Sequence, residues 1–328
     1  MNDPIFLLGA HKSGTSLLRS LFDGHEQVFP LPVETHFARH LGWWTRYPLK
    51  VQTPKSNLSR NDFINSSIQW VKECNRADDQ YGDSRAKGIF DEAIFGSRIS
   101  DLKEGQSESI IIETYFQALV ESIRELAIEP TTRIIEKSVE NSEHALKLKQ
   151  LFPGAKFIHI LRNPYSNLVT LRKYMQKLHP SYPHLDKLIK SVYDSFFYAR
   201  KNSESMQDYR VVLYEELVID TEGTMKNLAE FLGIRFGDSL LNPSFLGKPW
   251  SGNSVSGSSF KGVSNERLNP WIHEINSLEI NTVNKFLGEA VQQFSYDTIP
   301  DRKGAIWPMK RERIKEYLAN RVNLKRPF

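Results

Sequence analysis

The stretch PIFLLGAHKSGTSLLRSLFDGH, residues 4–25, decides the fold class of this chain. Its first apolar run, residues 5–8, predicts a buried strand. Apolar residues then recur at helical spacing from position 17 to position 22, which predicts a helix that Gly24 can end. Between the strand and the helix, Gly9 and Gly14 have the spacing of a phosphate-binding loop. The stretch therefore indicates a strand, an anion-binding turn and a helix, in that order.

The loop departs at one residue from the triphosphate-binding pattern G-x-x-x-x-G-K-[ST]. In that pattern a lysine follows the second glycine and reaches the terminal phosphates, while the next hydroxyl holds magnesium. Here Thr15 stands in that place, and the lysine of the loop is Lys12. Backbone N–H groups, the helix N-terminus and the hydroxyls of Ser13, Thr15 and Ser16 still provide donors for an anion. We therefore expect a phosphate ligand other than Mg·ATP, with Lys12 near the bridging oxygen of a shorter anhydride. A plain strand-to-helix turn is the alternative.

Composition sets broader bounds. The chain has 328 residues, of which 40% are hydrophobic and 25% charged, as in an ordinary globular protein with one large domain or two small ones. A net charge of +4 is too small to indicate a nucleic-acid partner. The single cysteine, Cys74, excludes an intramolecular disulfide and fits a reducing compartment. No run reaches the apolar length of a membrane span, and the first strand begins too early for a cleavable signal, so we expect a cytoplasmic protein.

The rest of the chain alternates short apolar runs with segments of helical period, the pattern of a parallel sheet covered by helices. Strands are predicted in TRIIEK (132–137), KFIHIL (156–161) and RVVLYEEL (210–217), and helices around 115–126, 144–152 and 225–232. The polar residues 36–109 are interpreted as an excursion of short helices and loops. The expected architecture is an α/β fold of the P-loop-NTPase type with three layers, a central parallel sheet flanked by helices. Residues 1–300 are expected to form one domain, followed by a basic segment at 301–328.

A second candidate anion site lies in KFIHILRNPYSNLVTLRKY, residues 156–174. Arg162 follows the predicted strand, Pro164 suits the first position of a helix, and Thr170 lies eight residues after the arginine. A guanidinium and a hydroxyl beside a helix N-terminus can hold a second phosphate at the carboxyl edge of the sheet, where open α/β sheets bind ligands. Taken alone, the pattern is explained equally well by an arginine on the surface after a strand.

Together these motifs resemble the sulfotransferases that use 3′-phosphoadenosine 5′-phosphosulfate (PAPS). HKSGTSLL is similar to the family's 5′-phosphosulfate loop, and ILRNPYSNLVT to its 3′-phosphate element, in which a serine normally takes the place of Thr170. Further segments similar to the family are EKSVEN, LKQLFPGAKFIHILRNP, VVLYEELVIDTEGTMKNLAEFLG and FKGVSNERLNPW. VETHF matches the Glu-Thr element of the tyrosylprotein and carbohydrate branches. The tyrosylprotein enzymes carry a membrane anchor and disulfides, and this chain shows neither pattern.

The resemblance implies in-line sulfuryl transfer without a metal ion. Lys12 would stabilise the leaving oxygen, Lys137 would neutralise the sulfuryl oxygens or the leaving group, and Glu34 would take the proton of the attacking hydroxyl. The residues implied in donor binding are Lys12, Ser13, Gly14, Thr15, Ser16, Arg162, Thr170, Tyr214, Lys261 and Gly262. Among them, Tyr214 resembles the tyrosine on the adenine side, and Lys261 and Gly262 would cap the 3′-phosphate. For Lys137, Tyr214 and Lys261, a solvated lysine or a core tyrosine is the alternative.

The acceptor is expected to be bound by the segment after Glu34, on the side of the excursion. Its aromatic and basic residues suit a sugar, an anionic glycan or a phenol equally well, and the candidates are His36, Arg39, Trp43 and Trp44. A small-molecule or carbohydrate acceptor is therefore expected. If VETHF is extended, Glu34 and His36 face the same side, and either can be the base. A small-molecule kinase or nucleotide hydrolase, and a binding module without catalysis, are the competing functions.

Overall fold

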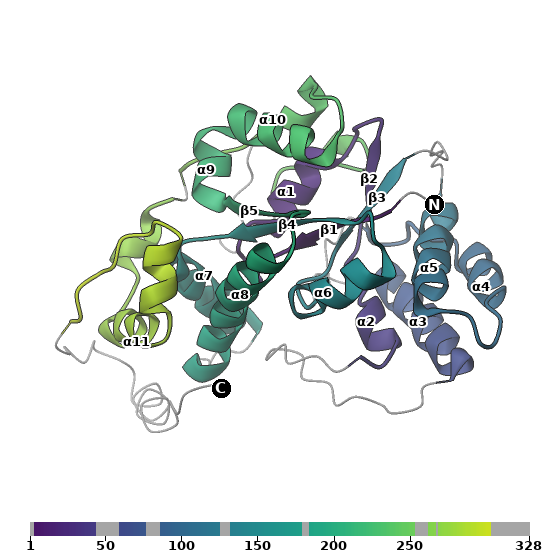
Figure 1. Cartoon of the computed structure of the whole chain (residues 1–328), viewed down its shortest axis with the longest axis horizontal. Coiled ribbons are helices and arrows are strands. Elements are labelled where there is room, and N and C mark those ends of the chain that lie inside the picture. Colours follow the sequence, from purple (N-terminus) through teal and green to yellow (C-terminus); the bar gives the residue numbers. More distant parts are fainter. Residues whose placement is uncertain are drawn as a thin grey trace.

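A five-stranded sheet with all strands parallel lies at the centre of the molecule, in the order β2-β3-β1-β4-β5 (Figure 1). The computed structural model describes residues 3–43, 59–76, 86–124, 132–178, 184–252, 262–266 and 268–302. The strands are β1 Ile5–Leu8, β2 Val28–Pro30, β3 Arg133–Lys137, β4 Lys156–Leu161 and β5 Tyr209–Leu213. The expected α/β class with a central parallel sheet is confirmed, and a small antiparallel pair, β6 Ser244–Phe245 and β7 Lys248–Pro249, lies apart from it.

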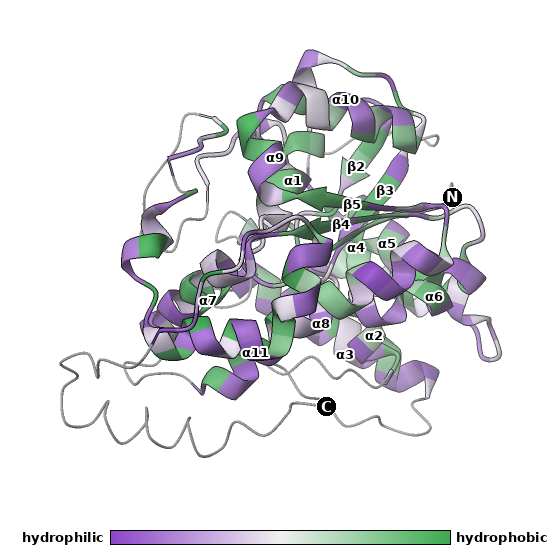
Figure 2. Ribbon diagram, turned by 60° about the vertical axis from the view of Figure 1, so that its left-hand side comes forward, coloured by the Kyte–Doolittle hydropathy of each residue, from purple (hydrophilic) through white to green (hydrophobic). Residues whose placement is uncertain are grey.

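Helices cover both faces of the sheet because successive strand residues point to opposite sides. Ile5 and Leu7 pack on one face against α1 (Thr15–Phe22), α9 (Tyr214–Ile219) and α10 (Thr221–Leu232). Phe6 and Leu8 pack on the other face, in a core shared with the excursion helices and α6 (Asn141–Leu151). Figure 2 shows the strands as a hydrophobic layer between helices whose outer faces are hydrophilic. The three expected layers are therefore present.

The remaining helices form the flanks of the molecule (Figure 1). The excursion contains α2 (Phe37–His40), α3 (Arg60–Arg76), α4 (Glu92–Ser100) and α5 (Glu108–Ser122). A second cluster is formed by α7 (Pro164–Leu178), α8 (Leu185–Ser205) and α11 (Ser277–Gln293), which pack against one another through apolar side chains. Two 3-10 turns, η2 (Asp238–Leu241) and η3 (Pro270–His273), complete the described elements. Pro164 is the first residue of α7, as its position after Arg162 predicts.

Several expected boundaries differ in the structure. The helix expected around 115–126 begins at Glu108 and ends at Ser122, where the chain bends to pair Ile123 with Phe90. The excursion was expected to hold short helices, but α3 is 17 residues long and buries one face, including Phe63 and Trp70. The strand expected across RVVLYEEL ends at Leu213, because the sheet ends there and the following residues coil into α9.

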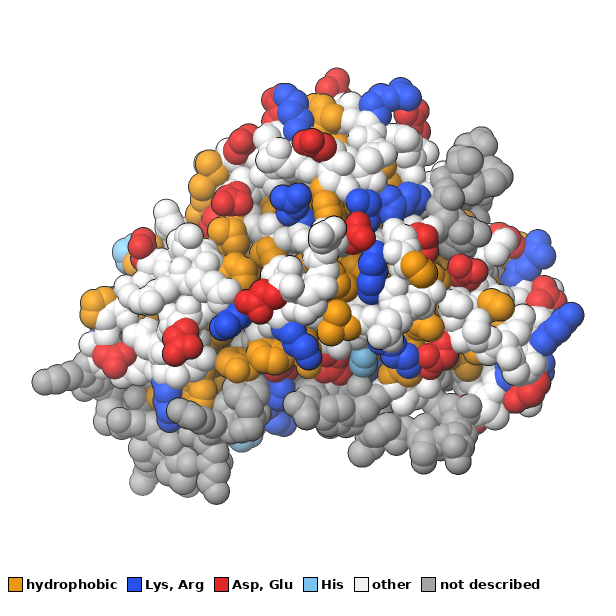
Figure 3. Space-filling model, in the orientation of Figure 1, with side chains coloured by type: hydrophobic (Ala, Val, Ile, Leu, Met, Phe, Trp, Pro, Cys, Tyr) orange, Lys and Arg blue, Asp and Glu red, His pale blue; other side chains and the backbone are white. Residues whose placement is uncertain are grey.

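Two further features concern the helices of the described residues and the face of the molecule seen in Figure 3. None of its helices combines the length and the apolar character that crossing a bilayer requires. On the face in Figure 3, basic and acidic side chains are interspersed among apolar ones. The domain boundaries expected from the sequence stay a prediction, and the basic segment lies almost wholly outside the described residues.

Gly9 is the tightest point between the sheet and the loop, and its replacement tests the packing there. Its φ of 149° lies in the region that L-residues avoid, and a Cβ at this position would lie 2.6 Å from the carbonyl oxygen of Ile160. We expect Gly9→Ala to lower the free energy of unfolding by about 1–3 kcal/mol, measured by chemical denaturation. Gly288→Ala is the matched control: it lies in α11 with open space around its Cα, and it should stabilise by ~0.5–1 kcal/mol. Equal effects of the two substitutions would contradict the packing.

Candidate active site

The parallel sheet brings one candidate residue from each strand to its carboxyl edge. In the spatial order of the strands, these residues are Glu34 after β2, Lys137 at the end of β3, Lys12 after β1, Arg162 after β4 and Tyr214 after β5. In sequence they are separated by up to 200 positions, but parallel strands place all five on one side of the sheet. The edge therefore collects cations, a carboxylate and an aromatic ring where ligands bind in open α/β folds.

The loop from Gly9 to Thr15 turns tightly and leaves the start of α1 open. Gly9 has φ 149°, Lys12 has φ 65° and Gly14 has φ 110°, so three residues of the loop have positive φ. The turn is closed by Ser13, whose N–H and hydroxyl both donate to the carbonyl of Ala10. No side chain caps the first turn of α1, since its N-cap residue is Gly14. The N–H groups of that turn are available to an anion.

Side chains from the β4–α7 segment and from α9 hold the loop in place. The amide of Asn167 donates to the carbonyl of His11 at 2.9 Å, and the guanidinium of Arg162 donates to the carbonyl of Lys12 at 3.1 Å. The ring of Tyr214 lies against Gly14, where a Cβ would come within 2.5 Å of it. The same ring carries Arg162 at 4.7 Å from its centroid. Only glycine at position 14 permits this approach.

The segment around Arg162 has polar groups that fit a second anion. Its Nε atom is buried and makes no hydrogen bond within the described structure, and the same holds for the hydroxyl of Ser166 in the first turn of α7. Burial lowers the pKa of Arg162, because the guanidinium loses hydration there. Thr170, by contrast, donates its hydroxyl to the carbonyl of Ser166 at 2.8 Å. The hydroxyl of Ser166 is therefore available for the phosphate contact that the sequence predicts for Thr170. The role of Thr170 in donor binding stays a prediction.

The side chain of Lys12 leaves the loop, contacts Tyr174 and lies within the electrostatic reach of Glu34 and Lys137. Its Nζ atom is 4.0 Å from the centroid of the Tyr174 ring, on α7. Burial, and then the positive charge of Lys137, lower the pKa of Lys12 to about 8, while Glu34 acts in the opposite direction. A lysine in this environment is destabilised as an ammonium and gains from an added negative charge. Its position suits the leaving group of an anionic ligand.

Glu34 and Lys137 form an ion pair at the carboxyl ends of neighbouring strands. Lys137 Nζ donates to Glu34 Oε1 at 2.5 Å, and the second carboxylate oxygen lies 3.8 Å from Nε2 of His36. The VETHF segment is not extended at His36, which has φ 50° and begins the turn into α2. The chain folds back at that residue, so the imidazole lies behind the carboxylate instead of beside it. Glu34 is 13% exposed and His36 1%.

A buried carboxylate, Glu136 on β3, is hydrogen-bonded to this turn. It accepts hydrogen bonds from the hydroxyls of Thr35 at 2.8 Å and Ser138 at 2.5 Å, and from the amide of Asn141. Burial raises its pKa to about 7, although these donors act in the opposite direction. Tyr115 donates to the carbonyl of Thr35 at 2.9 Å. Thr35, the residue that follows Glu34, is therefore fixed by contacts from α5 and β3.

Glu34, His36 and Glu140 also deserve comparison with a metal site, since one ligand atom of each lies within 4.8 Å of the others. Several of these ligand atoms already have partners: Lys137 donates to Glu34 Oε1, and His36 Nδ1 contacts Glu140 Oε1. A lysine ammonium stands where a cation would neutralise the carboxylate. We therefore treat the group as a hydrogen-bonded network, and the expected absence of a metal stays a prediction.

The expected acceptor residues lie in different surroundings. Trp43 is buried, donates to Glu108 at 2.7 Å and packs against His144. Arg39 is half-buried on α2. Acceptor contact by His36 or Trp43 stays a prediction that their burial does not support. Trp44 and Lys261 lie outside the described residues, and Gly262 has open space around its Cα.

Comparison with known proteins places the chain. The model of the Sulfotransferase family matches residues 4–238. The chain belongs to the sulfotransferase family. This is a family of transferase enzymes, and the resemblance noted in the loop and in the Arg162 segment is confirmed. The match ends before Gly262, so that residue and the basic segment lie beyond it.

Curated sulfotransferases match the sequence over different lengths, as two of them illustrate. The omega-hydroxy-beta-dihydromenaquinone-9 sulfotransferase Stf3 of Mycobacterium bovis is 26% identical over 133 residues, 38% of this chain and 34% of that protein. Protein-tyrosine sulfotransferase A of Caenorhabditis elegans is 23% identical over 286 residues, 83% of this chain and 61% of that protein. The chain therefore spans 34% and 61% of the lengths of these relatives.

Two solved sulfotransferase domains share the fold. The domain from the curacin biosynthetic pathway superposes with a TM-score of 0.59 and 18% identity, covering 91% of this chain and 99% of that domain. The domain from the Synechococcus PCC 7002 olefin synthase gives 0.56 and 18%, covering 92% and 98%. At this identity the likeness concerns the fold, a parallel sheet flanked by helices.

Sequence reasoning missed four residues that the structure brings into the sulfotransferase site: Ser166, Tyr174, Glu136 and Glu140. Ser166 and Tyr174 lie on the predicted helix of the Arg162 segment, and their spacing from Thr170, four residues on either side, places them on the same face of it. Glu136 and Glu140 flank Lys137 in the EKSVE segment. Two acidic residues within four positions of a predicted site lysine were the available signal.

Proposed function

We propose that this sulfotransferase moves a sulfuryl group from PAPS to a hydroxyl acceptor by in-line displacement. The observation that carries the proposal is the position of Lys12, which precedes the second glycine of the phosphate loop and lies within the electrostatic reach of Lys137 and Glu34. A lysine placed for the terminal phosphates of a triphosphate would follow Gly14. Here the cation stands at the loop, beside a carboxylate that can accept a proton.

The donor would be held at its two ends. The first turn of α1 and the hydroxyls of Thr15 and Ser16 would bind the 5′-phosphosulfate. Arg162 Nε and the hydroxyl of Ser166 are buried and have no hydrogen-bond partner among the residues that the structure describes, so they suit the 3′-phosphate. Tyr214 lies between these two positions, against Gly14 and under Arg162, where its ring can contact the adenosine. Donor contact by Lys261 and Gly262 remains part of this proposal.

The chain's own residues would carry the transfer step. When bound, PAPS supplies the sulfuryl group and a bisphosphate leaving group. Glu34 accepts the proton as the acceptor O–H bond breaks and its oxygen forms a bond to sulfur. Lys12 stabilises the phosphate oxygen that leaves with the electron pair of the breaking S–O bond. Lys137, already 2.5 Å from Glu34, neutralises charge on the oxygens between the carboxylate and the leaving group.

The acceptor is proposed at the level of its reacting group, a hydroxyl on a sugar, a glycan, a phenol or another alcohol. The names of the two curated relatives refer to a hydroxylated menaquinone derivative and to protein tyrosine, which share a hydroxyl and little else. Supplying labelled PAPS to an extract of the source cells and identifying the labelled product would show the acceptor. The cytoplasmic location expected from the sequence stays a prediction.

The function is tested by the release of adenosine 3′,5′-bisphosphate (PAP) from PAPS, with water as the acceptor hydroxyl when none is added. We expect Lys12→Ala to lower kcat by a factor on the order of 10²–10³, because the cation acts mainly on the leaving oxygen. PAP should still raise the melting temperature of this variant. The control is Lys226→Ala, a surface lysine paired with Glu222, which should leave kcat unchanged. A wild-type protein that releases no PAP, or a fully active Lys12→Ala, would contradict the proposal.

The pH dependence and metal dependence of the same assay follow from the site. Lys12 must be protonated to act, and its pKa of about 8 means that kcat/KM for PAPS falls as the pH rises above about 8. Lys12→Arg should move this fall to higher pH, since a guanidinium keeps its proton. EDTA should change neither the value of kcat/KM nor its fall with pH, because the chain's lysines take the place of a metal ion.

A further prediction concerns the 3′-phosphate. We expect Arg162→Ala to weaken PAP binding by ~1.5–3 kcal/mol, as for a charge-assisted contact, in a calorimetric titration. Adenosine 5′-phosphosulfate lacks this phosphate, so its binding should weaken much less. Arg200→Ala, an exposed arginine paired with Glu204, is the control and should bind both nucleotides normally. An equal loss for the two nucleotides would show that Arg162 acts only through its contact with the loop.

The third prediction concerns the base. Glu34→Gln should lose on the order of 10²–10⁴ in kcat, the effect of removing a general base, while PAP binding stays intact. His36→Gln should lose less, since the imidazole is buried behind the carboxylate. The measurement is a matched pair of steady-state assays of PAP release. The reverse ranking would move the role of base to His36.

A further inference from the structure

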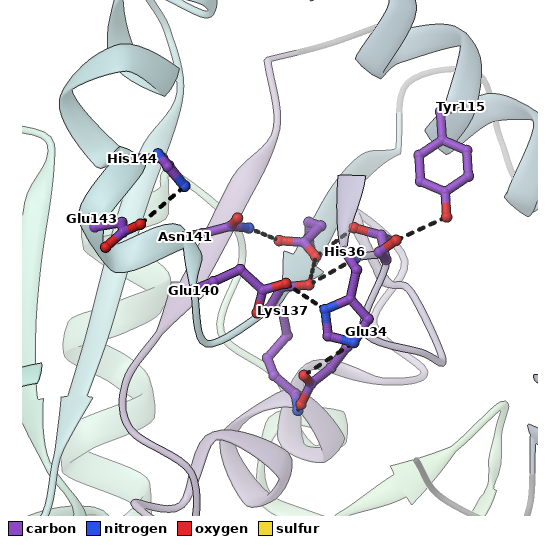
Figure 4. A network of polar contacts seen from close by, with 11 residues as sticks. Glu34, His36, Tyr115, Lys137, Glu140, Asn141, Glu143 and His144 are labelled. Carbon is purple, nitrogen blue, oxygen red and sulfur yellow. Dashed lines mark hydrogen bonds and ion pairs between the residues drawn. The ribbon is translucent and has the colours of Figure 1, made fainter. Parts of the chain in front are cut away.

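His36 is held between two carboxylates, and this arrangement has a direction (Figure 4). Its Nδ1 atom contacts Glu140 Oε1, and its Nε2 atom faces Glu34 Oε2 at 3.8 Å. His36 is 1% exposed and Glu140 3%, so both lie behind Glu34 as seen from solvent. Trp70 meets the imidazole edge-on, with ring centroids 4.9 Å apart. The ring therefore has little room to turn.

The contact with Glu140 determines which nitrogen carries the proton. An ionised carboxylate only accepts hydrogen bonds, so in the resting state Nδ1 is the donor to Glu140. A neutral imidazole with its proton on Nδ1 presents the lone pair of Nε2 to Glu34. The backbone supports this orientation, because the N–H of His36 donates to the hydroxyl of Ser138 at 3.3 Å.

We propose that Glu140 and His36 form a relay that receives the acceptor proton from Glu34, with Glu140 as a positioning residue. This inference rests on the proposed role of Glu34 as the base. Glu34 first takes the proton as the acceptor O–H bond breaks. Its O–H bond then breaks as the proton passes to the lone pair of His36 Nε2. Glu34 returns to the carboxylate, and the imidazolium is neutralised by Glu140.

The surroundings of the two groups explain why the proton moves on. The ammonium of Lys137 lies 2.5 Å from Glu34 and stabilises the carboxylate form, so Glu34 is a poor final holder of a proton. On the other side of the ring, the carboxylate of Glu140 contacts Nδ1 of His36, opposite the nitrogen that would receive the proton. A movement of Glu34 by about 1 Å brings its oxygen within hydrogen-bond distance of Nε2. The relay therefore frees Glu34 during the transfer. Once the product has left, the proton returns from His36 through Glu34 to water, and both groups regain their resting forms.

The wild-type protein provides the first test, independent of turnover. In ¹⁵N-histidine NMR spectra of the full chain, with His36 assigned by loss of its signal in His36→Gln, we expect a neutral imidazole protonated at Nδ1. In Glu140→Gln the population of this tautomer should fall. A wild-type His36 that is protonated at Nε2, or that is an imidazolium at the pH of the assay, would overturn the relay, since neither form can accept a proton at Nε2.

Turnover provides the second test, measured as PAP release from PAPS with water as the acceptor. Glu140→Gln should lower kcat by roughly 10-fold and leave KM for PAPS unchanged. The same substitution should have almost no further effect in a His36→Gln background, because both side chains act through one relay. Glu143→Gln is the matched control: it removes the next carboxylate on α6, which pairs with His144, and should retain wild-type kcat.

These results separate the relay from the function on which it rests. If Glu34→Gln loses its activity while Glu140→Gln turns over normally, the relay is wrong and Glu34 remains the base. If Glu34→Gln turns over normally, the proposed base itself is wrong, whatever Glu140 does. Additive losses in the double variant of Glu140 and His36 would mean that Glu140 acts on the fold and not through His36, which overturns the relay. PAP-induced stabilisation of each variant confirms that it is folded.

Discussion

The parallel alignment of the five strands is the constraint on which the site depends. Each strand ends at the same edge, so the chain segments that follow them meet there whatever their distance in sequence. The order β2-β3-β1-β4-β5 then sets the chemistry along this edge. Glu34 and Lys137 come together because β2 and β3 are neighbours, and Lys12 faces them because β1 lies next to β3. A different strand order would separate the carboxylate from both lysines.

Charge at this edge is compensated in pairs and not by exposure to water. Lys137 neutralises Glu34, and Glu140 accepts a hydrogen bond from Nδ1 of His36 in the proposed resting state, so each buried carboxylate has a partner nearby. Lys12 is the exception, since its pKa is lowered mainly by burial. An anionic ligand with charge beside Lys12 would remove this imbalance. Burying the Lys12 ammonium is unfavourable in the free protein. When the donor binds, its negative charge stabilises this ammonium, which contributes to affinity and to stabilisation of the transition state.

The features that the sequence predicts correctly are mostly local ones, formed by residues close together in the chain. The strand, loop and helix of residues 4–25 are correct because their signals, an apolar run and two spaced glycines, are contiguous. Pro164 opens α7 for the same reason. The contact between His36 and Glu140 could not be predicted, because it joins residues 104 positions apart and depends on the strand order. The burial of Trp43 could not be predicted either, because aromatic residues fill cores as readily as binding sites, and this one packs beside His144. Its contact with the acceptor stays a prediction.

The central claim is that the loop with the displaced lysine holds a bisphosphate nucleotide and not a triphosphate with magnesium. Calorimetric titration of the full chain with PAP and with Mg·ATP, under the same buffer, tests it most directly. We expect PAP to bind in the absence of any metal and more tightly than Mg·ATP, because the cations of the chain meet both of its phosphates. Tighter binding of Mg·ATP, lost on adding EDTA, would contradict it.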